Sequence, residues 1–285
     1  MEAIELADRC GFDAVEARCE FLSSCDTATL DAIATDLLAR ELSFGTANLP
    51  VNFHDDEATF QADLKCLPRI ARNLRRAGVT LFSTWLAPCH GAWPFDFHFE
   101  LHVRRLNLIA DVIEREGFKL GLEYLAPQTL RAGWPYSFIY SLAQTVELLN
   151  AVGRKCLGIL LDSFHWYTAN ETVKDLLALP FGSVLGVDLN DAPLGTQVNA
   201  QRDNERELPC ATGVIDLRGF LQAIAMRLSS AVPVRVEPFN AHLNSLPCEQ
   251  ALSLAMKSLH CAFSLLEQTV DAAHSEYKRI TSRVN

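Results

Sequence analysis

Two hydrophobic periods alternate along this chain, and their alternation restricts the fold more than any other feature. Seven short runs rich in β-branched and aromatic residues are separated by segments in which apolar residues recur with helical spacing. The runs cover residues 12–18, 43–50, 81–88, 120–127, 157–163, 184–191 and 232–239. Strands that alternate with helices and have nearly continuous apolar interiors are typical of a parallel sheet covered by helices.

The N-terminal region limits which parallel sheet can form. No G-x-G-x-x-G pattern follows the first run, so a dinucleotide-binding sheet is disfavoured and a (β/α)8 TIM barrel remains. No linker divides the chain, and we predict one α/β domain over residues 1–285. Residues 2–10 already form an amphipathic helical segment, so the predicted barrel lacks its first strand at the N-terminus. We expect the runs at 12–18 and 232–239 to flank the gap, with exposed edges that invite association or instability.

Composition and charge exclude several classes of partner. Of the 285 residues, 49% are hydrophobic, yet no apolar run is long enough to span a membrane, and the N-terminus lacks the regions of a signal peptide. The net charge of −10 has the wrong sign for a nucleic-acid partner. The nine cysteines include no C-x-x-C pair, so we interpret them as reduced thiols. We therefore predict a soluble, cytoplasmic protein without a membrane or nucleic-acid partner, and homo-oligomerisation stays open.

Four consecutive strands end in carboxylates, namely Glu123, Asp162, Asp188 and Glu237. In a barrel the carboxyl ends of the strands meet at one face, so these groups are expected close together. Like charges at short range cannot all ionise without compensation, and a shared divalent cation provides it. The alternative is a set of separate salt bridges to Arg or Lys. Only Arg235 lies within these strands, and we interpret strand alternation as pointing it away from Glu237.

The same segments resemble a known superfamily. The motifs are "GLEYL", "LDSFHW", "VDLNDAP", "RELPCATGVIDLRGFL" and "VRVEPF". They are similar to the xylose isomerase-like barrels, which include ketose 3-epimerases, hydroxypyruvate isomerases, inosose and 3-dehydroshikimate dehydratases and apurinic-site endonucleases. The resemblance implies that Glu123, Asp162, Asp188 and Glu237 ligate one divalent metal ion. It also implies that Glu123 and Glu237 act as catalytic base and acid, and that His165 lies near the substrate oxygens.

The chain departs from the family pattern in two places. The resemblance places a histidine, or sometimes a glutamine, where this sequence has Asp188. A set made only of carboxylates should favour Mn²⁺ or Mg²⁺ over Zn²⁺, because oxygen ligands suit the harder ions. The segment "PCATG" stands in place of the usual "PGxG" turn, in a loop that reaches over the site in relatives. That second departure puts the substrate preference in doubt.

Other candidates would face the substrate. In relatives an arginine near Arg206 binds a substrate oxygen or carboxylate, and the alternative is a solvated loop charge. Trp85 lies near the end of the third run, and His90 follows that run. Both side chains could line a sugar-sized pocket, although aromatic packing explains them equally well. Asp191 is either a supporting carboxylate beside the metal or a cap for the following turn.

These observations together predict a metal-dependent isomerase or epimerase. Its substrate would be a small keto-sugar or polyol-derived ketone, from which a proton alpha to the carbonyl is moved. A dehydratase with an inosose-like or 3-dehydroshikimate-like substrate is the first alternative, and a barrel that binds ligand without turnover is the second. An apurinic-site endonuclease is disfavoured, because the strand-end candidates include one histidine and the net charge is negative.

Overall fold

The computed structural model describes residues 2–54 and 56–281, and the side chains of these up to residue 266. Its main feature is a parallel sheet with the strand order β1-β2-β3-β5-β7-β8-β9. The strands are β1 (Ala14–Ala17), β2 (Ser43–Asn48), β3 (Leu81–Leu86), β5 (Lys119–Tyr124), β7 (Leu157–Asp162), β8 (Val184–Leu189) and β9 (Val234–Val236). Each predicted run overlaps one of them, with β5 beginning one residue before its run, and the predicted α/β barrel architecture is confirmed. A short antiparallel pair, β4 (Cys89–His90) and β6 (Tyr136–Ser137), was not predicted.

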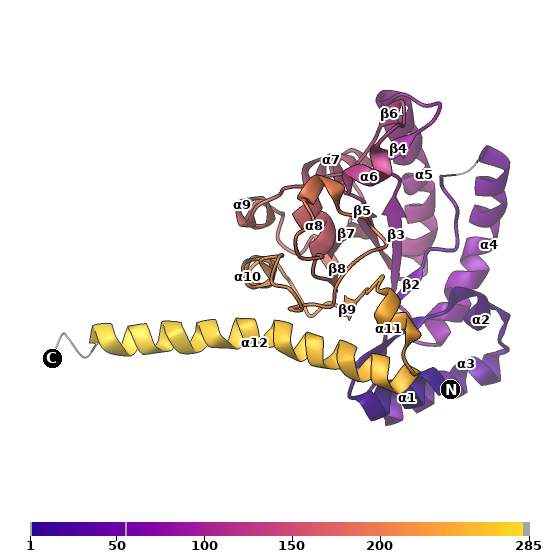
Figure 1. The fold of residues 1–285 in the computed structure, drawn as a ribbon. Helices are drawn as coiled ribbons and strands as arrows, with labels where there is room; N and C mark the ends of the chain where they lie inside the picture. The colour runs from indigo at the N-terminus through magenta and orange to yellow at the C-terminus, as the bar shows by residue number, and fades with distance from the viewer. Residues whose placement is uncertain (1, 55, 282–285) are drawn as a thin grey trace.

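Helices lie around this curved sheet, and the long C-terminal helix extends past it (Figure 1). They are α1 (Glu2–Cys10), α2 (Cys19–Ser24), α3 (Thr27–Ala39), α4 (Glu57–Arg76), α5 (Phe95–Arg115), α6 (Gln128–Arg131), α7 (Leu142–Val152), α8 (Ser163–Thr168), α9 (Val173–Leu177), α10 (Leu217–Ala225), α11 (Ala241–Ser245) and α12 (Cys248–Thr281). Gly78 and Gly117 follow α4 and α5 with φ of 100° and 76°, a backbone that glycine adopts without strain at a helix end. No helix in the described chain combines the length and the hydropathy that a bilayer crossing requires.

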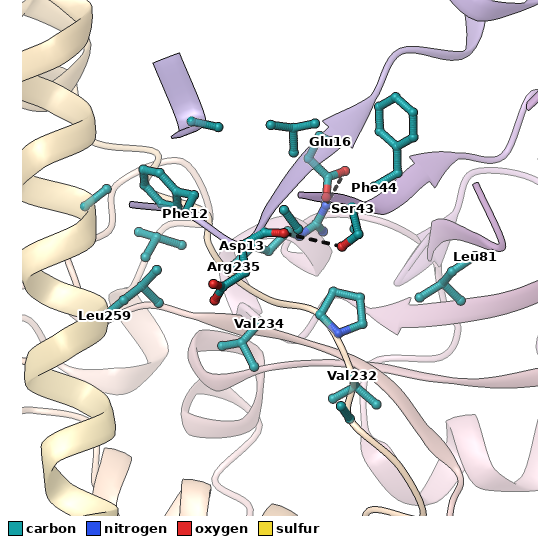
Figure 2. Close-up of a pocket in the computed structure, with 18 of the residues that line it drawn as sticks. Phe12, Asp13, Glu16, Ser43, Phe44, Leu81, Val232, Val234, Arg235 and Leu259 are labelled. Carbon is teal, nitrogen blue, oxygen red and sulfur yellow. Dashed lines mark hydrogen bonds and ion pairs between the residues drawn. The ribbon is translucent and has the colours of Figure 1, made fainter. Parts of the chain in front are cut away.

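The barrel is open on one side. Within the described residues β1 and β9 are the two end strands of the sheet, where a closed barrel would hold an eighth strand. A cavity of about 1340 Å³ lies at this opening, and α12 and α1 pack together beside it. Its wall is largely apolar and includes Val15, Phe44, Val232 and Leu259 (Figure 2). The predicted gap between the first and last runs is therefore confirmed.

Strand register decides which side chains face the barrel interior. Aligned residues on neighbouring parallel strands share a face, and the register aligns Trp85 with Glu123, Asp162 with Asp188, and Asp188 with Arg235. The alternate residues of the central strands point outward and pack under the helices. They include Leu122, Ile159, Leu161, Val187 and Leu189, all of which are buried. This apolar outer layer holds the polar interior positions in fixed places.

Candidate active site

The four strand-end carboxylates converge inside the barrel. One oxygen each of Glu123, Asp162, Asp188 and Glu237 lies within 4.8 Å of the others. Asp162 and Asp188 are fully buried, Glu123 is 7% exposed, and the side chain of Glu237 is partly buried. The sequence therefore predicted correctly which carboxylates the fold brings together.

Crowding and burial change the protonation of these groups. Burial first, and then the charges of Asp188 and Asp162, hold the pKa of Glu123 well above its usual range. Burial and the charge of Glu123 raise the pKa of Glu237 to about 8. Asp162 differs, because its contacts with Arg206 and the Phe164 N–H outweigh the effect of burial and lower its pKa. The site thus pairs two glutamates that readily hold a proton with an aspartate that stays ionised.

Arg206 is one of two arginines inside this cluster. It is 2% exposed, and its Nη1 donates to Asp162 Oδ2 at 2.7 Å and to Glu237 Oε2 at 3.1 Å. Its Nη2 donates to Asp203 Oδ1 at 2.6 Å, a partner that the sequence did not indicate. The guanidinium also lies over the rings of Phe164 and Phe239. The alternative interpretation from the sequence, that Arg206 is a solvated loop charge, is therefore wrong.

Arg235 is the second arginine, and its orientation corrects the sequence interpretation. Residues two apart on a strand share a face, so Arg235 and Glu237 both point inward and not apart. Arg235 Nη2 lies 3.7 Å from Glu237 Oε1. The guanidinium forms two hydrogen bonds with Asp188, from Nε to Oδ1 and from Nη2 to Oδ2, the second at 2.6 Å. The expectation that strand alternation removes Arg235 from the cluster was wrong.

The residues present fit a divalent cation. When all four carboxylates are ionised, the two guanidiniums leave two negative charges without a partner in the cluster. Burial together with this excess charge is why the two glutamates hold protons so readily. Oε1 of Glu123 is buried, and among the described residues it accepts no hydrogen bond. An ion with two positive charges would balance this excess and give that oxygen a partner.

His165 lies beside the unpartnered oxygen of Glu123. The ring is fully buried, and its Nε2 is 3.4 Å from Glu123 Oε1 and 3.6 Å from Asp203 Oδ1. Its Nδ1 accepts the N–H of Ala126 at 3.3 Å. Burial lowers the pKa of His165, which favours the neutral ring.

A known protein family matches most of this chain. The family model described as "Xylose isomerase-like TIM barrel" matches residues 4–259. The chain belongs to this family. The inosose isomerase of Bacillus subtilis is 28% identical over 156 residues, which are 54% of this chain and 51% of that protein. The chain therefore spans about half the length of the curated relatives it matches.

Solved structures of xylose isomerase-like barrels superpose on almost the whole chain. A xylose isomerase domain protein from Alicyclobacillus acidocaldarius is 28% identical with a TM-score of 0.80, over 93% of each chain. The IOLI protein with a bound zinc atom has a TM-score of 0.78 and 22% identity, over 92% of each chain, and this likeness concerns the fold.

The remaining candidates of this xylose isomerase-like barrel, Trp85 and His90, lie on β3 and in the short β4–β6 pair. Trp85 is half-exposed on β3, aligned with Glu123, and its indole stacks on His54 with ring centroids 4.7 Å apart. His90 lies in the β4–β6 pair, where its Nδ1 accepts the N–H groups of Ala92 and Trp93. Trp85 therefore shares a sheet face with Glu123. Nδ1 of His90 already accepts two backbone hydrogen bonds, so only Nε2 is left to contact a ligand.

Asp191 organises a loop. Its carboxylate accepts the backbone N–H groups of Thr212, Gly213 and Ile215 at 2.7–3.0 Å. The neighbouring Asn190 donates from Nδ2 to both oxygens of Asp162. Of the two interpretations of Asp191, the structure supports the turn and loop role.

Proposed function

We propose that this chain is a metal-dependent isomerase or epimerase acting on a small keto-sugar or polyol-derived ketone. The observation that carries the proposal is the pair of glutamates, Glu123 and Glu237, whose pKa values are raised in a cluster that has an excess of two negative charges when all four carboxylates are ionised. A carboxyl group with a pKa near the working pH can both take and return a proton. The inosose isomerase relative supports the same class of reaction.

The proposed ligands of the ion are Glu123, Asp162, Asp188 and Glu237, with Mn²⁺ or Mg²⁺ favoured by their oxygen donors. When bound, such an ion would polarise a substrate carbonyl and acidify the neighbouring C–H. Glu123 comes from β5 and Glu237 from the segment after β9, so the two glutamates approach the site from different strands. In the proposal one takes the proton and the other returns it, to the opposite face or to the adjacent carbon.

The other residues would hold the substrate and keep the carboxylates in place. His165 is neutral and would offer a hydrogen bond to a substrate oxygen beside Glu123. Arg206 fixes Asp162 and Glu237 relative to each other, and it would also attract an oxygen-rich ligand. Trp85 would provide an apolar wall against the C–H face of a sugar, and His90 would border the same pocket.

Solvent exchange tests this function directly. Purified protein with Mn²⁺ is incubated in deuterium oxide with a panel of ketoses, an inosose and 3-dehydroshikimate. Deuterium in the recovered ketose or in its epimer is the expected result, and Glu123→Gln or Glu237→Gln should abolish it. The variant Glu205→Gln changes an exposed loop carboxylate and serves as the matched control.

Two other outcomes would contradict the proposal. A new conjugated carbonyl product, detected by its absorbance, would assign a dehydratase in place of an isomerase. Ligand binding without exchange, and with the same affinity in the Glu123→Gln variant, would assign a binding protein.

A further inference from the structure

The pairing of β8 with β9 places Arg235 at one side of the carboxylate cluster. Arg235 stands on β9 in register with Asp188 on β8, and both side chains point into the barrel. Inward-facing neighbours on adjacent strands are close enough for their side chains to pair. Both oxygens of Asp188 are hydrogen-bonded by this one guanidinium. Asp188 is fully buried, and the side chain of Arg235 is 22% exposed.

Further contacts fix the guanidinium across the open side of the barrel. Arg235 Nη1 lies 3.3 Å from Glu16 Oε2 on β1 (Figure 2). The same nitrogen lies 3.3 Å from Thr46 Oγ1 on β2. The same Thr46 hydroxyl donates to Glu16 Oε2 at 2.7 Å, which completes the network. Strands from both edges of the gap therefore hold Arg235 in place, and releasing Asp188 from it would break two hydrogen bonds at once.

The two arginines differ in the carboxylates to which they form hydrogen bonds. Arg206 bonds to one oxygen of Asp162 and one oxygen of Glu237. Arg235 forms hydrogen bonds to both oxygens of Asp188 and has a longer approach to Glu237. In the described site Glu123 has no guanidinium bonded to it. Of the four carboxylates, Asp188 is thus the one fully engaged by a cation of the chain itself.

We propose that Arg235 is an internal cation that withholds Asp188 from the metal ion. The ion is then held by Glu123, Asp162 and Glu237, and the positive charge of Arg235 weakens its binding. This inference rests on the proposed function, since it concerns the same metal site. It revises the proposed ligand set from four carboxylates to three.

Direct measurement of Mn²⁺ binding by calorimetry tests the inference without any substrate. Arg235→Gln removes a positive charge a few ångströms from the ion, and we expect binding to be on the order of ten- to a hundredfold tighter. Arg235→Lys keeps the charge and should stay near the wild-type affinity. Arg202→Gln makes the same change of net charge at an exposed loop position, and it should have no effect.

The double variant Asp188→Asn with Arg235→Gln removes both charges of the pair and leaves two amides that can hydrogen-bond. If Asp188 is withheld, this variant binds Mn²⁺ about as tightly as the wild type. Strongly weakened binding in the double variant would show that Asp188 is a ligand and would overturn the inference. The double variant also covers the case in which Arg235→Gln alone fails to fold, because it leaves no unpaired buried charge.

Failure of the inference differs from failure of the proposed function. Equal Mn²⁺ affinity in the wild type and Arg235→Gln overturns the role of Arg235 and leaves the metal site intact. Absence of Mn²⁺ binding in the wild type, in Arg235→Gln and in the double variant overturns the metal-dependent function, and the inference with it.

Discussion

Glu171 is a largely buried carboxylate whose protonation should affect the stability of the fold. Its carboxylate accepts the Tyr124 hydroxyl at Oε2, 2.5 Å away, and the Leu142 N–H at Oε1, 2.6 Å away. Tyr124 directly follows Glu123, so this contact supports the end of β5 behind the candidate site. Burial raises the pKa of Glu171 from 4.5 to about 7, although the two hydrogen bonds act in the opposite direction. The replacement Glu171→Gln keeps the shape and removes the charge.

The raised pKa fixes the sign and the size of the effect. A group whose pKa is higher in the folded state stabilises the fold fully below the unfolded value of 4.5, and that contribution is lost as the pH rises to about 7. The difference between the two pKa values corresponds to about 3 kcal/mol. Glu171→Gln does not titrate, so its free energy of unfolding relative to wild type should rise by about 2–3 kcal/mol between pH 4.5 and 8.

Urea unfolding at several pH values, with EDTA present throughout, measures this difference. The carboxylate cluster also titrates, but it is present in both proteins, so its contribution cancels in the comparison. Glu205→Gln, in an exposed loop, should run parallel to the wild type at every pH. If Glu171→Gln also ran parallel to the wild type, the buried carboxylate would not be destabilised at neutral pH, and the reasoning would be refuted.

Three further predictions concern the loop and the site. Asp191→Ala should lower the free energy of unfolding by about 2–4 kcal/mol, because the N–H groups of Thr212, Gly213 and the buried Ile215 lose their acceptor. Urea unfolding measures the change, and an unchanged value would contradict the loop role. Arg206→Met should lower the free energy of unfolding by about 3–5 kcal/mol, because Asp162 loses its charge partner. Thermal unfolding should show that Mn²⁺ restores part of this loss, and equal melting temperatures with and without the ion would argue against a nearby cation site. Trp85→Ala should raise KM about three- to tenfold with little change in kcat; steady-state kinetics on the substrate found by exchange checks it, and a fall in kcat at constant KM would place Trp85 in the chemistry instead.

The strand-end carboxylates could be predicted because their position depends on a general property of parallel barrels. Carboxyl ends of the strands meet at one face, so Glu123, Asp162, Asp188 and Glu237 had to converge once the strands were assigned. The open side could be predicted for a similar reason, since the count of strands needs no knowledge of side-chain contacts. Both features follow from the order of elements along the chain.

The arginine pairings depend on information that hydrophobic patterns do not contain. Pairing of Arg235 with Asp188 requires the register between β8 and β9, and the period of a single strand does not determine the register of two. Arg206 reaches Asp162 across 44 positions from within an irregular loop. Glu171 likewise meets Tyr124 through the path of the loop after α8. A spacing of two between Arg235 and Glu237 was the available signal, since it places both on one strand face.

The Asp188–Arg235 pair would also explain how this barrel can differ from the family pattern and still hold the proposed metal ion. The resemblance places histidine at position 188, and a neutral imidazole adds no charge to the cluster. An aspartate alone would add one negative charge, but the pair that it forms with Arg235 is neutral as a unit. The charge that a bound ion would meet is then set by Glu123, Asp162 and Glu237 together with Arg206. With no imidazole among the proposed ligands, the preference for Zn²⁺ over Mn²⁺ should be smaller than in a site that contains histidine, and competition between the two ions for the protein would measure it.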